Sequence, residues 1–269
     1  MGKGLPQALN HCDVPVNSVV YGPVPSWRLG RSLGIDLLST EGKTCSFDCI
    51  YCQLGITLYP LAERREFVSL NQVKTELQAV SGIEADYATF SGVGEPTLAS
   101  NLGQAISMVK LILHLPVAVL TNSSLMPRED VRRDLAGADV VVAKVDAPEE
   151  ELFRRVNRPF VGYSLDEILQ GIKLFRKNYH GKLAIQIMFV ELNKRYAREM
   201  AEIATGLSPD EVQLNTPLRP CGVEPLSPPE MAAIKEDFAG FDVVEVYKAP
   251  APEVVPVNAI ETLRRRPEL

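Results

Sequence analysis

The chain has 269 residues, of which 46% are hydrophobic and 23% charged, a balance typical of a soluble globular protein. No apolar run approaches the ~20 residues that a membrane-spanning helix needs, and the N-terminal stretch holds no apolar signal-peptide core. The formal net charge of −6 disfavours general attraction to nucleic-acid backbones. We therefore expect a cytoplasmic protein without membrane contact, and a nucleic-acid partner is the less favoured expectation.

Short β-branched runs alternate with longer amphipathic runs along the chain. The short runs predict strands at residues 32–38, 87–91, 116–122, 139–145, 182–190, 211–216 and 242–246. The amphipathic runs predict helices at residues 70–80, 102–113, 164–175, 194–205 and 227–238. In the third of these helices, Ser164 and Glu167 have the spacing of a capping box.

Strands separated by helices of this length indicate βαβ units and a parallel sheet. We predict an α/β fold, a partial (β/α)6 TIM-like barrel with parallel strands, and an open doubly wound sheet is the alternative. The core barrel is assigned to residues 21–220, after an N-terminal leader or cap at 1–20 and before a C-terminal helix, strand and tail at 221–269. The tail after Ala249 contains Arg264, Arg265 and Arg266 and is expected to be a solvated extension.

The chain has five cysteines, Cys12, Cys45, Cys49, Cys52 and Cys221. An odd number in a reducing compartment argues against a disulfide framework, and clustering favours a metal. Three of them form a C-x3-C-x2-C segment, whereas a tetrahedral zinc or an ordinary electron-carrying cluster takes four ligands. Two interpretations remain open: an iron–sulfur cluster with one open iron, or a zinc or electron-carrier site completed by Cys12 or Cys221.

The cysteine segment, with Tyr51 just before its third cysteine, resembles the radical S-adenosylmethionine (radical SAM) superfamily. The resemblance implies a [4Fe-4S] cluster held by Cys45, Cys49 and Cys52, whose open iron binds S-adenosylmethionine. It implies reductive cleavage of that cofactor to methionine and a 5′-deoxyadenosyl radical, which abstracts hydrogen from a substrate. A reductant such as flavodoxin or ferredoxin is implied as well.

Downstream motifs support the same resemblance. Ser91-Gly92-Val93-Gly94-Glu95 resembles the superfamily's glycine–glycine–glutamate motif, with Val93 inserted, and the motif's role is to hold the methionyl amino group. Glycines also let a backbone approach a ligand closely, and a carboxylate accepts hydrogen bonds from an ammonium. A glycine-rich turn opening a helix is the alternative interpretation.

Polar residues at the other strand ends are expected to contact the cofactor. The resemblance implies that the Tyr51 carbonyl contacts the adenine of S-adenosylmethionine, Asp146 its ribose and Lys144 its carboxylate. It implies Asn122 and Asn215 as further contacts. Asn122 is equally suited to cap the following helix, and Lys144 is equally suited to pair with Asp146, because residues two apart share one face of a strand. No catalytic residue is assigned.

The segment from Tyr21 to Asp36 resembles the branch of the superfamily that is related to wyosine-type tRNA synthases. Those enzymes carry a second cluster, for which the two remaining cysteines are too few. A small-molecule or peptide substrate is therefore expected, and a tRNA substrate is the alternative. Arg28, Arg31 and Arg158 suit an anionic substrate, because arginine forks match carboxylate and phosphate, or equally suit salt bridges that support the fold.

Overall fold

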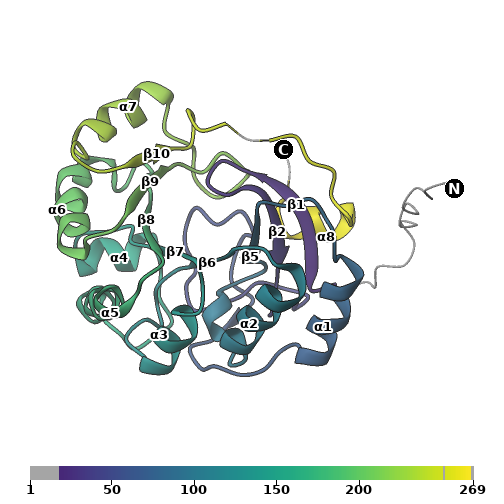
Figure 1. Cartoon of the computed structure of the whole chain (residues 1–269). Helices are drawn as coiled ribbons and strands as arrows, with labels where there is room; N and C mark the ends of the chain where they lie inside the picture. Colours follow the sequence, from purple (N-terminus) through teal and green to yellow (C-terminus); the bar gives the residue numbers. More distant parts are fainter. Residues whose placement is uncertain (1–17, 251, 268–269) are drawn as a thin grey trace, which may run out of the picture.

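One curled sheet of eight strands forms the centre of the computed structural model, which describes residues 18–250 and 252–267 (Figure 1). Its strand order is β1-β2-β5-β6-β7-β8-β9-β10. The strands are β1 (Val20–Ser26), β2 (Gly30–Ile35), β5 (Tyr87–Phe90), β6 (Val117–Thr121), β7 (Val140–Lys144), β8 (Lys182–Met188), β9 (Glu211–Asn215) and β10 (Val243–Glu245). All neighbouring pairs are parallel except β1 and β2. The predicted partial barrel of parallel strands is confirmed.

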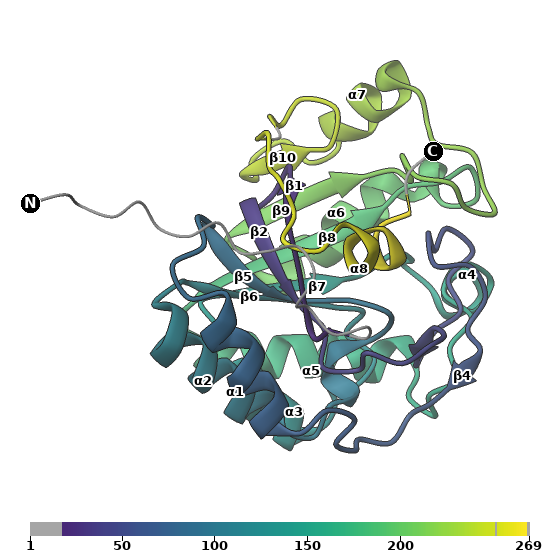
Figure 2. The same cartoon turned by 90° about the vertical axis from the view of Figure 1, so that its right-hand side faces the viewer.

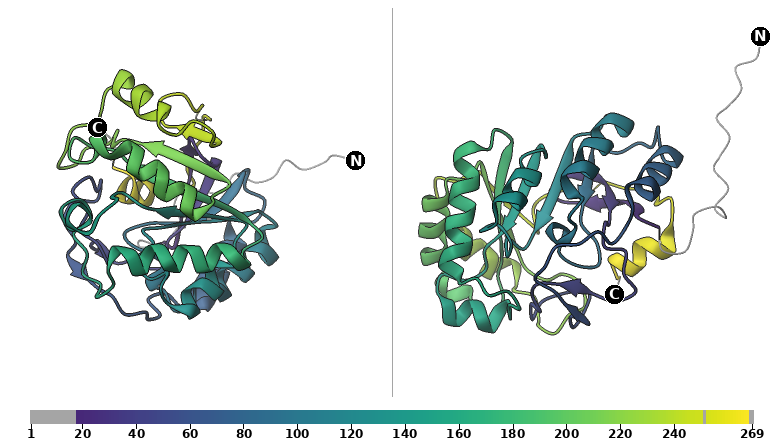
Figure 3. Two further views of the ribbon diagram at one scale, coloured as in Figure 1. Left: turned by 90° about the vertical axis from the view of Figure 1, so that its left-hand side faces the viewer. Right: turned by 90° about the horizontal axis from the view of Figure 1, so that it is seen from below.

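Helices cover the outer, convex face of this sheet (Figure 3). They are α1 (Leu70–Ala79), α2 (Leu102–Leu113), α3 (Glu129–Leu135), α4 (Glu150–Val156), α5 (Leu165–Asn178), α6 (Ala197–Leu207) and α7 (Pro228–Glu236), whereas α8 (Ala259–Arg265) packs against β1 and contributes to the cavity wall. Two short 3-10 helices, η1 (Pro96–Leu98) and η2 (Lys194–Tyr196), precede α2 and α6. The predicted capping box of α5 is present, with Ser164 and Glu167 bonded reciprocally. No helix in the described part of the chain is long and apolar enough to cross a bilayer.

Alternation along the strands divides the buried residues between two environments. In β7, Val141 and Ala143 belong to the main core between sheet and helices. Val140 and Val142 turn instead into a smaller apolar cluster with Leu29 at the inner face of the sheet. This cluster closes one part of the barrel interior, so the polar strand ends and the loops that follow them surround the space that remains.

A two-stranded sheet carries the cysteine segment. β3 (Thr44–Cys45) pairs in parallel with β4 (Tyr59–Pro60), and the loop between them holds Cys49 and Cys52. This loop follows the carboxyl end of β2, which is the edge where parallel barrels place their ligands.

The predicted helices and sheet strands are present within a few residues, but α3 and α4 were not predicted. Each has only seven residues, with acidic residues in its first turn and basic residues in its last turn. Too few apolar residues remain between these turns to show helical periodicity. Val19 is buried and β1 begins at Val20, one residue before the predicted start of the core barrel. Residues 1–17, with Cys12, lie outside the described residues.

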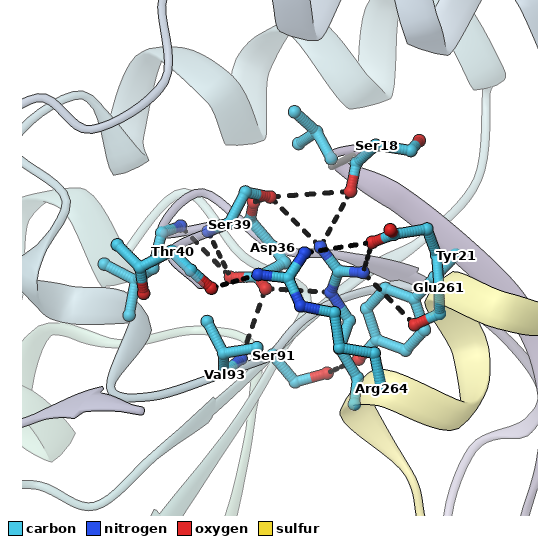
Figure 4. Close-up of polar contacts among 12 residues, drawn as sticks. Ser18, Tyr21, Asp36, Ser39, Thr40, Ser91, Val93, Glu261 and Arg264 are labelled. Carbon is cyan, nitrogen blue, oxygen red and sulfur yellow. Dashed lines mark hydrogen bonds and ion pairs between the residues drawn. The ribbon is translucent and has the colours of Figure 1, made fainter. Parts of the chain in front are cut away.

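The predicted solvated tail is wrong for the residues that the structure describes. α8 packs against β1, where the Gly22 amide donates to Oγ1 of Thr262 at 3.0 Å (Figure 2). Arg265 is fully buried, with its Nε 2.8 Å from Asp36 and a second ion pair to Glu261. Figure 4 shows Asp36 and Glu261 in this polar cluster. Arg265 can be buried because these two carboxylates compensate its charge, whereas Arg264 and Arg266 are partly exposed.

Candidate active site

The concave face of the sheet encloses a cavity of about 460 Å³. Its wall includes residues from strands at both ends of the sheet and from the cysteine loop. Of the predicted site residues, Tyr51, Cys52, Gly92, Lys144 and Asn215 line it. The cavity volume lies in the range of small-ligand pockets.

The cysteine loop is attached to the glycine motif by backbone pairing. The Thr44 amide donates to the Val93 carbonyl at 3.1 Å, and the Glu95 amide donates to the Thr44 carbonyl at 3.3 Å. A Cβ atom on Gly94 would overlap the Thr44 carbonyl oxygen. Gly94 is therefore required because the backbone of Thr44 passes too close for a side chain. The close approach is to another segment of the same chain and not to a ligand.

A second attachment joins the loop to the end of α4. The amides of Asp48 and Ile50 donate to the carbonyls of Asn157 and Val156, each at 3.0 Å. The Phe47 ring meets the Phe153 ring edge to face, with 5.3 Å between centroids. The loop that carries the cysteines is therefore held by two separate parts of the barrel.

Hydrogen-bond donors surround the cysteine sulfurs. Nδ2 of Asn122 lies 3.6 Å from Sγ of Cys45, and Nδ2 of Asn157 lies 3.5 Å from Sγ of Cys49. Burial works to lower the pKa of Lys43, but the three nearby thiols, Cys52 first, raise it overall. Amide and ammonium donors of this kind stabilise negatively charged sulfur.

Burial acts on two of the three thiols, Cys45 and Cys49, by raising the pKa. Burial, with smaller contributions from Cys49 and Glu95, raises the pKa of Cys45 to about 12. Burial also raises the pKa of Cys49. A metal must displace these protons, because thiolate is the ligand form. The three thiols and their cationic and amide neighbours fit an iron–sulfur cluster.

The fourth cysteine that the structure describes has a hydrogen-bond partner in its own segment. Cys221 donates its Sγ–H to the Val223 carbonyl at 3.2 Å. Within residues 18–250 and 252–267, no three Cys, His, Asp or Glu side chains are grouped to hold a single metal ion.

Glu95 is buried among donors of its own chain. Its Oε1 accepts from the amide and hydroxyl of Thr97 and from the Thr121 hydroxyl, and its Oε2 accepts from the Asn122 amide at 2.7 Å. Burial raises its pKa against the opposing effect of these bonds. The side chain does not line the cavity; it caps η1 and fixes the position of Asn122.

The Asp146 carboxylate is likewise bonded to donors of its own chain. Its carboxylate accepts from the Tyr51 hydroxyl, from Nδ2 of Asn157 at 2.8 Å and from the Met188 amide at 2.8 Å. Lys144 lies 3.9 Å from the same carboxylate, so the predicted pair exists, and its Nζ stands 4.2 Å from the centre of the Tyr51 ring. Lys144 lines the cavity whereas Asp146 does not.

The three arginines considered for an anionic substrate have separate positions. Arg31 pairs with Glu84 and, at 2.7 Å, with Asp86, as expected of a salt bridge that supports the fold. Arg158 lies 3.8 Å from Asp48 and is 56% exposed. Only Arg28 of the three lines the cavity.

The sequence did not single out Lys43 or Asn157 for a role. Lys43 stands two residues before Cys45, so its proximity is a local signal that was available. Asn157 reaches Cys49 across 108 positions in the chain, and nothing in the local pattern indicates that contact.

Comparisons with known proteins agree with this arrangement. The profile described as "Radical SAM superfamily" matches residues 42–204, and the chain belongs to that superfamily. It is therefore an enzyme, and membership implies S-adenosylmethionine and an iron–sulfur cluster as cofactors.

Two relatives carry the family name UPF0026. The UPF0026 protein MJ1312 of Methanocaldococcus jannaschii is 39% identical over 234 residues, covering 84% of this chain and 72% of the relative. The UPF0026 protein slr1464 of Synechocystis is 40% identical over 202 residues, covering 75% and 76%.

A solved structure shows the same fold at low identity. Streptococcus suis SuiB bound to S-adenosylmethionine has a TM-score of 0.60 at 13% identity, with 76% of this chain covered. The chain spans about half of SuiB, 48% of its length, so the likeness is one of fold with part of that protein.

Proposed function

We propose that the chain binds a [4Fe-4S] cluster through Cys45, Cys49 and Cys52 and cleaves S-adenosylmethionine reductively. The observation that carries the proposal is the group of three thiols beside amide and ammonium donors, of which Cys52 lies on the wall of a ligand-sized cavity. Three ligands leave one iron open for the amino and carboxylate groups of S-adenosylmethionine. When bound, the cluster supplies the electron that cleaves this cofactor to methionine and a 5′-deoxyadenosyl radical.

The residues on the cavity wall are the proposed contacts for S-adenosylmethionine. Lys144 is assigned to the carboxylate, because its ammonium lines the cavity beside the Tyr51 ring. The backbone of Gly92, on the cavity wall, is assigned to the methionyl amino group together with that of Gly94, which lies behind the wall against Thr44, and Asn215 is a further contact. The Tyr51 carbonyl is assigned to the adenine.

Three of the predicted residues act on their neighbours in this proposal. Glu95 positions Asn122, and Asn122 in turn donates to Cys45. Asp146 orients Tyr51 and Asn157, which is consistent with burial of its carboxylate away from the cavity wall. A ribose contact by Asp146 would need these donors to move.

The proposed substrate is a small molecule or a peptide, from which hydrogen is abstracted. A cytoplasmic protein reductant such as flavodoxin or ferredoxin would supply the electron. The proposed core barrel spans residues 21–220, with a leader at 1–20 and a C-terminal part at 221–269.

Anaerobic reconstitution with iron and sulfide tests the metal assignment. Four irons per chain are expected, with an electron paramagnetic resonance (EPR) signal of the reduced protein that changes when S-adenosylmethionine is added. Cys45→Ala, Cys49→Ala and Cys52→Ala should each lose the signal, whereas the matched control Cys221→Ala should keep it. Stoichiometric zinc, or loss of the cluster in Cys221→Ala, would contradict the proposal.

A further inference from the structure

The cavity is basic although the protein is acidic. Among the residues that line it, five are cationic and none of those the structure describes is Asp or Glu. The cationic residues are Arg28, Lys144, Arg219, Arg265 and Arg266. In a chain with a net charge of −6, this concentration of one sign marks the cavity as a place for negative charge.

Two of the five cations have acidic partners just behind the wall. Arg265 is paired with Asp36 at 2.8 Å and with Glu261. Lys144 lies 3.9 Å from Asp146. Their charges are largely balanced by the fold.

Arg28 differs from these two. It lies in the turn between β1 and β2, its guanidinium carbon is 4.9 Å from the centre of the Trp27 ring, and its Nε is shielded from solvent without a hydrogen-bond partner. Burial first, and then the charges of Arg266 and Arg219, lower its pKa to about 10 against the opposing effect of Glu211. Arg28 therefore stays charged at neutral pH in a place where positive potential is already high.

Three chain segments bring arginines to the cavity wall. Arg28 comes from the β1–β2 turn, Arg219 from the segment after β9, and Arg266 from the end of α8. Arg219 donates to Oε1 of Gln53 at 3.0 Å, so it also touches the segment just after Cys52. Three like charges repel one another, and an anion between them removes that repulsion.

We propose that Arg28, Arg219 and Arg266 bind a carboxylate or phosphate group of the substrate. The proposal rests on the proposed function, which assigns the part of the same cavity that Cys52 and Gly92 line to the cluster and S-adenosylmethionine. Planar guanidinium forks bind both oxyanions in pairs of charge-assisted hydrogen bonds. The substrate is then a small anionic molecule held by its charged end, with its reacting carbon toward the cofactor.

Fluorescence of Trp27 gives a local test, because it is the only tryptophan of the chain and lies against Arg28. The reconstituted full-length protein with S-adenosylmethionine is titrated anaerobically with inorganic pyrophosphate, and separately with succinate. Calorimetry of the same titrations gives the dissociation constants. We expect saturable binding of at least one anion, and the stronger of the two identifies the group as phosphate or carboxylate.

Arg28→Gln should raise that dissociation constant about tenfold or more, because a charge-assisted bond is lost. Arg28→Lys should restore part of the affinity. Arg31→Gln is the matched control, since Arg31 lies on the same hairpin but is held by Asp86 at 2.7 Å and does not line the cavity. The dissociation constant of Arg31→Gln for the anion should equal that of the unsubstituted protein.

Equal binding by Arg28→Gln and the unsubstituted protein would overturn the proposal. Binding of neither anion, with saturable binding only of an RNA oligonucleotide, would also overturn it. Release of 5′-deoxyadenosine is measured in parallel to separate the two proposals. If no 5′-deoxyadenosine forms but anion affinity still depends on Arg28, only the proposed function fails. If 5′-deoxyadenosine forms and anion affinity is independent of Arg28, only the anion site fails.

Discussion

The side-chain amide of Asn157 lies 3.5 Å from the sulfur of Cys49. The same nitrogen is 2.8 Å from the Asp146 carboxylate, which holds the amide in place and also accepts from the Tyr51 hydroxyl. A single donor group therefore connects β7, the cysteine loop and the end of α4. Hydrogen bonds to cluster sulfurs are one of the means by which proteins set a cluster's reduction potential.

Asn157→Leu should shift the reduction potential of the bound cluster to more negative values. The substitution keeps the volume but removes the donor to Cys49, so the reduced, more negative cluster loses stabilisation. An anaerobic redox titration followed by EPR measures the shift. The control Asn71→Ala, at an exposed position of α1, should leave the potential unchanged. An unaltered potential in Asn157→Leu would show that the amide does not influence the cluster.

Gly94→Ala should displace the cysteine loop, because its Cβ would overlap the Thr44 carbonyl. Overpacking of this kind costs about 1–3 kcal/mol, and bound iron per chain should fall with it. Gly162→Ala is the control, since a Cβ there meets nothing within 4 Å. Both variants are compared by iron analysis and by the free energy of unfolding in urea. Full iron content in Gly94→Ala would mean that the loop accommodates the methyl group.

Arg265→Ala should lower the free energy of unfolding by about 3–5 kcal/mol, because it leaves the buried carboxylate of Asp36 without its cation. Arg133→Ala, whose pair with Glu129 is exposed, should change it by less than about 1 kcal/mol. Urea denaturation of both variants gives the comparison. Equal stabilities would contradict a structural role for α8 in the described fold.

The stability of the protein should depend on Asp130 in acid. The side-chain bonds to Arg128, and then to Arg64, hold the pKa of Asp130 below its usual value. The guanidinium groups of Arg128 and Arg64 stabilise the ionised form of Asp130. This stabilisation is therefore present above about pH 4, the ordinary pKa range of Asp, and is lost as the pH falls through the lowered pKa.

Asp130→Asn should therefore reduce the pH dependence of unfolding below about pH 4. The effect should be less than about 1 kcal/mol, because the Asp130 side chain is 42% exposed and solvent screens the pair. Urea unfolding of both proteins from pH 7 to pH 3 measures it. A variant that loses stability in acid as steeply as the unsubstituted protein would refute the assignment.

Local sequence patterns were sufficient for the strands of the sheet other than β1, which was not predicted, and for the cysteine group. Runs such as Val140–Lys144 carry their strand signal within five residues, and C-x3-C-x2-C is complete within eight. The polar strand ends were also found, because the carboxyl ends of parallel strands share one edge. These features depend only on neighbours in the chain.

Side-chain direction at those strand ends depends on distant partners and could not be predicted. Glu95 and Asp146 were expected to face the cofactor, but donors from Thr121 and Met188 bury their carboxylates within the fold. Arg265 was read as solvated because its partner Asp36 lies 229 positions away. In each case the missing information was a tertiary contact, and the hydrophobic periodicity of a local segment does not reveal such contacts.

Release of 5′-deoxyadenosine tests the central claim most directly. The reconstituted protein is incubated anaerobically with S-adenosylmethionine and dithionite, and the products are quantified by liquid chromatography and mass spectrometry beside Cys49→Ala and Cys221→Ala. We predict that 5′-deoxyadenosine and methionine form with the unsubstituted protein and with Cys221→Ala, and that neither forms with Cys49→Ala. Protein with a full iron complement that releases no 5′-deoxyadenosine under these conditions would contradict the account.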